Sequence, residues 1–138
     1  MDALSEIAGY VKQNSRNKIV FCKDAVPGLD YVDVGVQLAS GLSGTDNPTT
    51  ACEALVRQMM DAASVDEAVG KYLAIQNIFM LFEPELKLNV RDLFDYCSRD
   101  KCLVVMSPLE VHEGKLRLPN SNQAMAQLDG LSYLVVRK

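Results

Sequence analysis

The amino-acid sequence predicts one α/β domain, residues 1–138, with a mainly parallel sheet and helices on both faces in three layers. Short apolar runs alternate with segments whose apolar residues recur every three or four positions, as in three-layer α/β folds. Two of these runs, residues 72–75 and 102–106, are apolar throughout, as expected of strands that are covered on both faces. A chain of 138 residues is long enough for one domain with a substantial core.

The first third of the chain is predicted to contain two helices and two strands. Residues 3–14 have the helical spacing of an amphipathic helix, carried by Leu4, Ile7, Ala8 and Val11. Residues 18–22 read as a short buried strand, and Tyr31, Val32 and Val34 read as a second strand. Residues 36–42 suit a short helix that ends near two glycines, and residues 43–48 suit a loop.

The middle of the chain carries two apparent helix-start signals. Thr50 and Glu53 form the pattern of a capping box after Pro48, which predicts a helix over residues 51–63. Ser64 and Glu67 repeat that pattern and predict a short turn that ends at Gly70. The apolar run 72–75 follows as a central strand.

The last part of the chain is predicted to contain one more helix and four more strands, two of which form a hairpin. An apolar stretch over residues 78–82 ends at Pro84, and Asn89 is expected to cap a helix. The strand at 102–106 is closed by Pro108. A hairpin is predicted over residues 111–118, with its turn at Glu113 and Gly114, and a last strand over residues 131–136.

Composition and charge argue against several classes of function. The net charge of −4 is unfavourable for binding nucleic acid directly, which usually requires a concentrated basic face. No apolar run reaches the length of a membrane span, and the N-terminus is amphipathic with early acidic residues rather than signal-like. We therefore expect a cytoplasmic protein that does not bind a membrane.

The residues that usually carry metal or nucleophilic chemistry are scattered. The four cysteines (Cys22, Cys52, Cys97 and Cys102) form no CxxC pair and lie on apolar strands or apolar helix faces. The single histidine, His112, falls in the predicted hairpin without a marked nucleophile beside it. We predict four reduced structural cysteines, no catalytic residues, no cofactor and no metal.

The strand at residues 19–22 ends in a loop that contains Gly28, and this arrangement raises the question of a phosphate-binding loop. Such a loop requires several glycines, a Gly-Lys-Ser/Thr sequence and a helix whose N-terminus faces the anion. Residues 24–30 supply one glycine and two acids, and Lys23 precedes the loop. Parallel neighbours need a crossover of roughly a dozen residues. The two strands are therefore either connected in another way or not adjacent.

Residues 71–108 resemble the second half of BrxF, the small P-loop protein of BREX phage-resistance systems. The most specific part is LFEPELKL at residues 81–88, which is similar to Leu-Phe-Asp-Pro-Glu-Leu-Lys-Leu in that family. Asn77, Ser98-Arg99-Asp100 and Leu103-Val104-Val105 also match, and EVHEGKLRL at 110–118 is similar to the family's Glu-x-x-x-Gly-x-Leu hairpin.

The resemblance implies a P-loop ATPase-like scaffold that has lost its chemistry. Family members have a Gly-x-x-Gly-x-Gly-Lys-Thr loop after the first strand, and this chain lacks it. Gln76 stands where the family has an acid, and a neutral amide cannot supply the charge that orients magnesium or water. What the resemblance implies here is a degenerate, P-loop NTPase-like α/β domain.

These observations predict a non-catalytic accessory or adaptor protein of a bacterial anti-phage system, acting through contacts with protein partners. The expected surface lies where the central strand ends, because partners of open α/β sheets gather at the carboxyl ends of strands. Its candidate residues are Gln76, Asn77, Glu83, Glu85 and Lys87. A nucleotide-binding ATPase or sensor with a non-standard site, and a regulatory adaptor unrelated to defence, remain as alternatives. Formation of a homo-oligomer also stays open.

Overall fold

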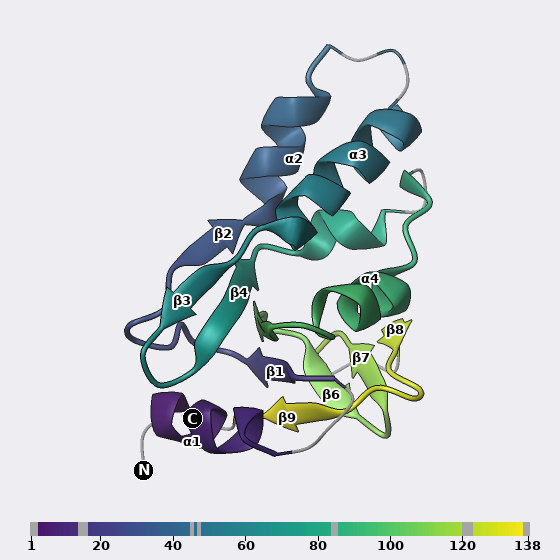
Figure 1. The fold of residues 1–138 in the computed structure, drawn as a ribbon. Coiled ribbons are helices and arrows are strands. Elements are labelled where there is room, and N and C mark those ends of the chain that lie inside the picture. The colour runs from purple at the N-terminus through teal and green to yellow at the C-terminus, as the bar shows by residue number, and fades with distance from the viewer. Residues whose placement is uncertain are drawn as a thin grey trace.

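A six-stranded, mainly parallel sheet forms the centre of the protein (Figure 1). The computed structural model describes residues 3–13, 17–44, 46, 48–83, 86–119 and 123–136. The sheet has the order β2-β4-β5-β1-β9, and β3 pairs with β4 beside this path. Its strands are β1 (Ile19–Cys22), β2 (Tyr31–Asp33), β3 (Ser64–Asp66), β4 (Gly70–Gln76), β5 (Cys102–Met106) and β9 (Tyr133–Val135). Only β3 runs antiparallel to its neighbour.

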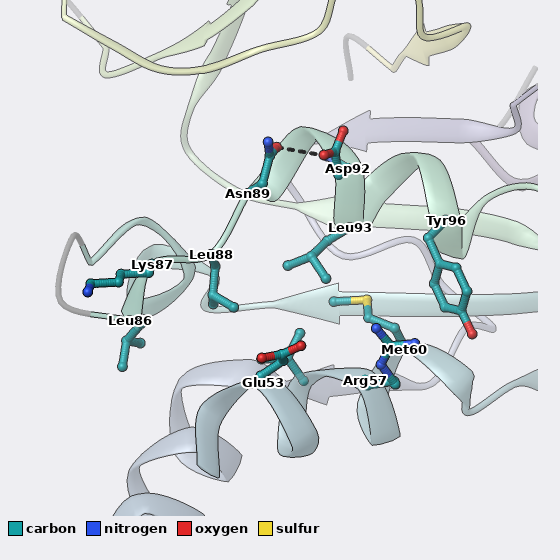
Figure 2. Close-up of a pocket in the computed structure, with 11 residues that line it drawn as sticks. Glu53, Arg57, Met60, Leu86, Lys87, Leu88, Asn89, Asp92, Leu93 and Tyr96 are labelled. Carbon is teal, nitrogen blue, oxygen red and sulfur yellow. Dashed lines mark hydrogen bonds between the residues drawn. The ribbon is translucent and has the colours of Figure 1, made fainter. Parts of the chain in front are cut away.

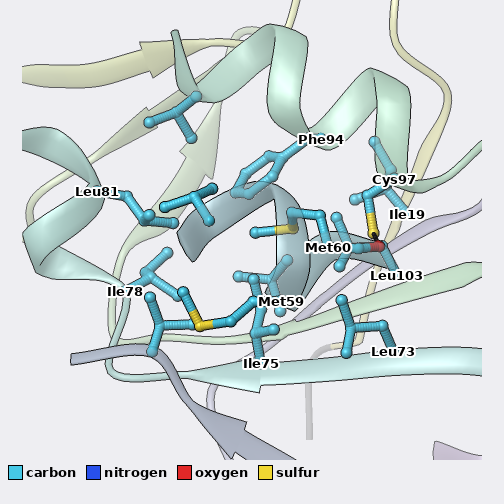
Figure 3. Packing of buried hydrophobic residues seen from close by; sticks show 14 of the residues in the cluster. Ile19, Met59, Met60, Leu73, Ile75, Ile78, Leu81, Phe94, Cys97 and Leu103 are labelled. Carbon is cyan, nitrogen blue, oxygen red and sulfur yellow. Dashed lines mark hydrogen bonds between the residues drawn. The ribbon is translucent and has the colours of Figure 1, made fainter. Parts of the chain in front are cut away.

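Helices cover both faces of this sheet, as the sequence predicts. Along β1, Val20 and Cys22 belong to a core with Ile7 of α1 (Ala3–Val11). Ile19 and Phe21 face the opposite way, into a core with α3 (Pro48–Asp61) and α4 (Val90–Cys97). Figure 3 shows this second core, in which Met60 and Phe94 lie over the strands. The predicted α/β architecture is therefore confirmed.

The chain between β5 and β9 forms a second, antiparallel sheet. It consists of β6 (Glu110–His112), β7 (Lys115–Arg117) and β8 (Ala124–Gln127), in that order. The turn between β6 and β7 uses positive φ angles at Glu113 and Gly114. Leu116 of β7 and Leu128 after β8 are buried in the core that α3 and α4 share. The third strand, β8, was not expected from the sequence.

The short connection from β1 to β2 is explained by the strand order. β2 is parallel to β4, and β4 and β5 lie between β2 and β1. The sequence left two possibilities, a different kind of connection or two strands that are not adjacent. The structure shows the second, because the strands at 19–22 and 31–33 are not neighbours. Residues 23–30 contain no helix and pass from one strand to the other on the α1 side, where Val26 and Leu29 are buried.

Three local predictions were wrong, each for a physical reason. The strand at residue 31 ends at Asp33, because the Asp33 side chain accepts a hydrogen bond from the Val36 N–H and begins α2 (Val34–Leu42). Thr50 is not a helix cap, because α3 already starts at Pro48. Ser64 starts β3 rather than a turn, and the Asp66 carboxylate instead accepts from the N–H groups of Ala68 and Val69.

Between β4 and β5, the chain forms a short helix and a capped helix. Residues 79–82 form the 3-10 helix η1 (Phe79–Phe82), in which Leu81 is buried and Phe82 is half-buried. Asn89 caps α4 by accepting from the Asp92 N–H at 3.1 Å, as predicted. Pro84, residue 14, and residues 45 and 47 of the predicted loop lie outside the described residues.

Candidate functional site

The carboxyl ends of β2 and β4 are joined by side chains. Asp33 and Gln76 are register partners at the last positions of their strands. Asn77 follows with a φ of 56°, and its Nδ2 donates to Asp33 Oδ1 at 2.9 Å. The hydrogen bond from the Val36 N–H and then the one from Asn77 lower the pKa of Asp33. A side-chain hydrogen bond therefore links the carboxyl ends of β2 and β4.

Gly35 is required for this bridge because the chain passes very close to Asn77. A Cβ atom at Gly35 would lie 2.3 Å from Asn77 Nδ2 and 3.2 Å from the Asn77 carbonyl oxygen. Any side chain at residue 35 would displace the amide that binds Asp33. Sequence reasoning did not identify Asp33 or Gly35 as part of this site; the available signal was an aspartate directly before a helix-compatible run.

The residues predicted to form a partner surface do not all lie at this edge. Gln76 is half-buried, Asn77 is exposed and bound to Asp33, and Glu83 is exposed just after η1. Lys87 is exposed and lines a groove between α3 and α4 as well as a second cleft beside β8. Gln76, Asn77 and Glu83 line neither this groove nor this cleft. Glu85 lies outside the described residues.

Three backbone N–H groups of the loop after β1 donate hydrogen bonds within the chain. The Val26 N–H donates to the Tyr31 hydroxyl at 2.9 Å, and the Asp30 N–H donates to the Tyr72 hydroxyl at 2.9 Å. The Leu29 N–H donates to the Val26 carbonyl. Burial raises the pKa of Tyr31 to about 12, so its hydroxyl stays neutral. A phosphate cradle needs free amides that converge on the anion, whereas two of these three amides donate to tyrosine hydroxyls and the third donates to a carbonyl.

A cavity of about 480 Å³ lies at the carboxyl ends of β1 and β9. Phe21 and Val135 contribute its apolar lining, and Lys23 and His112 contribute basic groups. The Lys23 ammonium is 3.5 Å from Glu110 Oε1, and both side chains are solvent-accessible. The one lysine beside this loop is thus paired with a carboxylate from β6.

The four cysteines are free and buried, in the positions that the sequence predicts. Burial raises the pKa of Cys97 and of Cys102 to about 12, so both remain protonated thiols at neutral pH. Among the described residues, no three His, Cys, Asp or Glu side chains gather closely enough to hold a metal ion. The helices within that same part of the chain are too short or too polar to span a membrane.

The groove between α3 and α4 has a volume of about 450 Å³ (Figure 2). Its floor is formed by Val56, Met60 and Leu86, which are buried. Leu88 and Leu93 are half-buried along its side, and Tyr96 is exposed at one end.

We find no match to this chain among protein-family models, curated proteins or solved structures. The site must therefore be interpreted from its own geometry.

Proposed function

We propose that the protein is a non-catalytic accessory protein of the bacterial cytoplasm that acts by binding other proteins, as an adaptor of a BREX-like anti-phage system. The defence setting rests on the resemblance of residues 71–108, and the P-loop-like ancestry of the sheet rests on the same segment. The mode of action rests on the geometry described above.

The observation that carries this proposal is the closed loop after β1. Val26 and Leu29 are buried in the core, and the N–H groups of Val26 and Asp30 donate to the hydroxyls of Tyr31 and Tyr72. A nucleotide phosphate at this position would have to displace those hydrogen bonds and would meet Asp24 and Asp30. A scaffold that has its phosphate position filled by its own chain is better suited to present a surface than to bind ATP.

The nucleotide alternative is tested directly by ligand-induced stabilisation. We expect no change in melting temperature with millimolar ATP or GTP and magnesium. A nucleotide at about 100-fold excess over its Kd would stabilise the protein by about 2.7 kcal/mol, which is readily detected. Saturable stabilisation would show that a nucleotide site exists, and the adaptor proposal would then be abandoned in favour of an ATPase or sensor.

Protein binding is tested by affinity capture from the native host, followed by mass spectrometry. We expect recovery of other components of the defence system, in particular its large methyltransferase and ATPase. Glu83→Lys, at the exposed end of η1, is expected to reduce that recovery. Glu67→Lys provides the matched control, because Glu67 is also exposed but lies in the β3–β4 turn. If the two variants and the wild-type chain recover the same proteins in the same amounts, Glu83 does not belong to the interface.

A further inference from the structure

The groove between α3 and α4 has an aromatic side chain fixed at one end. The Tyr96 hydroxyl donates to Asp61 Oδ1 at 2.6 Å, and the Arg57 guanidinium lies 5.8 Å from the centre of the Tyr96 ring. Tyr96 is 47% exposed although Asp61 binds its hydroxyl and Arg57 lies over its ring. An exposed aromatic ring that is already ordered binds a partner at little further cost in side-chain entropy.

The charges on the α3 side of the groove are not paired with each other. Glu53 and Arg57 are one helical turn apart, an arrangement that ordinarily produces an ion pair. Arg57 instead lies over Tyr96, and within the described residues Glu53 has no ion-pair partner. Among the residues that line the groove, α3 therefore contributes a negative charge at Glu53 and a positive charge at Arg57, and Figure 2 shows Arg57 at the Tyr96 end. The Asp61 carboxylate, which accepts from the Tyr96 hydroxyl, is not part of that lining.

The opposite side of the groove adds little competing charge. Asp92 is held by the Arg91 guanidinium at 3.1 Å. Lys87 is exposed, and Figure 2 shows its ammonium directed away from the groove. The apolar lining, together with Glu53 and Arg57 as the charged α3 residues that line the groove, forms its recognition pattern.

We propose that this groove binds an amphipathic helix of a partner protein, whose apolar side chains contact Leu88, Leu93 and Tyr96 and which carries a basic residue toward Glu53 and an acidic residue toward Arg57. The proposal rests on the adaptor function and names the chemistry of its partner. A helix is favoured over an added strand because α3 and α4, rather than a sheet edge, form the walls. The spacing of Glu53 and Arg57 by one turn also matches charges one turn apart on a facing helix.

The proposal is tested with two synthetic peptides and fluorescence anisotropy. Both are amphipathic helices with leucines at helical spacing. The first carries one lysine and one glutamate a turn apart, and in the second the lysine is replaced by glutamate. We expect the wild-type chain to prefer the first peptide by about tenfold, since removal of one attraction and introduction of one repulsion act together.

Glu53→Lys makes both charged α3 residues of the groove lining positive and is expected to invert that preference, so that the second peptide binds more tightly. An inverted preference cannot arise from misfolding, which would weaken both peptides. Glu67→Lys is the matched control and should retain the wild-type preference. If neither peptide binds at millimolar concentration, or if Glu53→Lys leaves the preference unchanged, the groove is not a helix-binding site of this chemistry.

Two further outcomes separate this proposal from its alternatives. Concentration-dependent dimerisation of the wild-type chain that Glu53→Lys abolishes would show that a second copy occupies the groove, and the partner-helix proposal would be rejected. Capture of host proteins that Glu53→Lys leaves unchanged would retain the adaptor function and reject the groove. An inverted peptide preference without any captured protein would instead retain the groove and reject the adaptor function.

Discussion

Gly35→Ala is expected to destabilise the fold, although alanine is a better helix former than glycine. The new Cβ would lie 2.3 Å from Asn77 Nδ2 and 2.8 Å from Asn77 Cγ, far inside van der Waals contact. Asn77 cannot move freely because its backbone has a φ of 56° and its amide binds Asp33. Overpacking of this kind costs about 1–3 kcal/mol, whereas the gain in helix propensity is at most about 1 kcal/mol. We expect a net loss of about 1–2 kcal/mol.

The measurement is urea unfolding followed by far-UV circular dichroism. Gly9→Ala is the control, because Gly9 lies in α1 with nothing within 4 Å of its added Cβ. That substitution should raise the free energy of unfolding by up to about 1 kcal/mol. The opposite signs of the two Gly→Ala changes separate the close contact at Asn77 from helix propensity.

A double-mutant cycle attributes the cost at Gly35 to Asn77. Asn77→Gly removes the side chain that the new Cβ would meet and keeps a residue that adopts positive φ without strain. In that background, Gly35→Ala should be neutral or slightly stabilising, which gives a coupling of about 1–2 kcal/mol. If the two substitutions are additive within about 0.5 kcal/mol, or if Gly35→Ala alone is stabilising, the described packing of α2 against Asn77 is wrong.

Three further changes test the acid response, the thiols and the core. Because hydrogen bonds lower the pKa of Asp33 from 3.8, its contribution to stability is present above pH 3.8 and is lost as the pH falls through the lower, folded-state pKa. The melting temperature of the wild-type chain should thus fall more steeply below pH 3.8 than that of Asp33→Asn, and parallel curves would contradict this. Because the pKa values of Cys97 and Cys102 are about 12, a thiol reagent at pH 8 should label them only after unfolding, and rapid labelling of the native protein would refute their burial. Leu81→Ala, at a side chain that is 1% exposed, should cost about 2–5 kcal/mol, and half-buried Phe82→Ala should cost less; an equal or larger effect at Phe82 would refute the described turn.

The buried strands and the capped helix could be predicted because their signals are local. Residues 72–75 and 102–106 are apolar on both faces, and they form interior strands. Asn89 precedes a helical apolar pattern and caps α4. β3 carried no such signal. It pairs with the first half of β4, while β2 pairs with the second half of the same strand, and this sharing of one edge depends on tertiary structure.

The sites were less predictable because their parts lie far apart in the chain. Sequence reasoning placed Gln76 and Asn77 at the end of a central strand, which is where they lie. It could not pair Asn77 with Asp33, because the two residues are 44 positions apart. The groove combines residues of α3 with residues of α4, and Tyr96 continues the apolar spacing of Leu93 although it is exposed. Only the packing of the two helices shows which apolar residues remain accessible.

The loop between β1 and β2 contributes to the stability of the fold through buried side chains and backbone hydrogen bonds. Its amides bind tyrosines from β2 and β4, and Val26 and Leu29 fill the core under α1. A helix after β1 would need roughly a dozen residues, but the chain has only residues 23–30 before β2 begins. Substituting glycines and a lysine into this loop would therefore remove buried contacts without providing the helix N-terminus that binds phosphate. Val26 and Leu29 therefore tie this loop to the packing of α1 against the sheet, and replacing them would cost stability as well as change the loop.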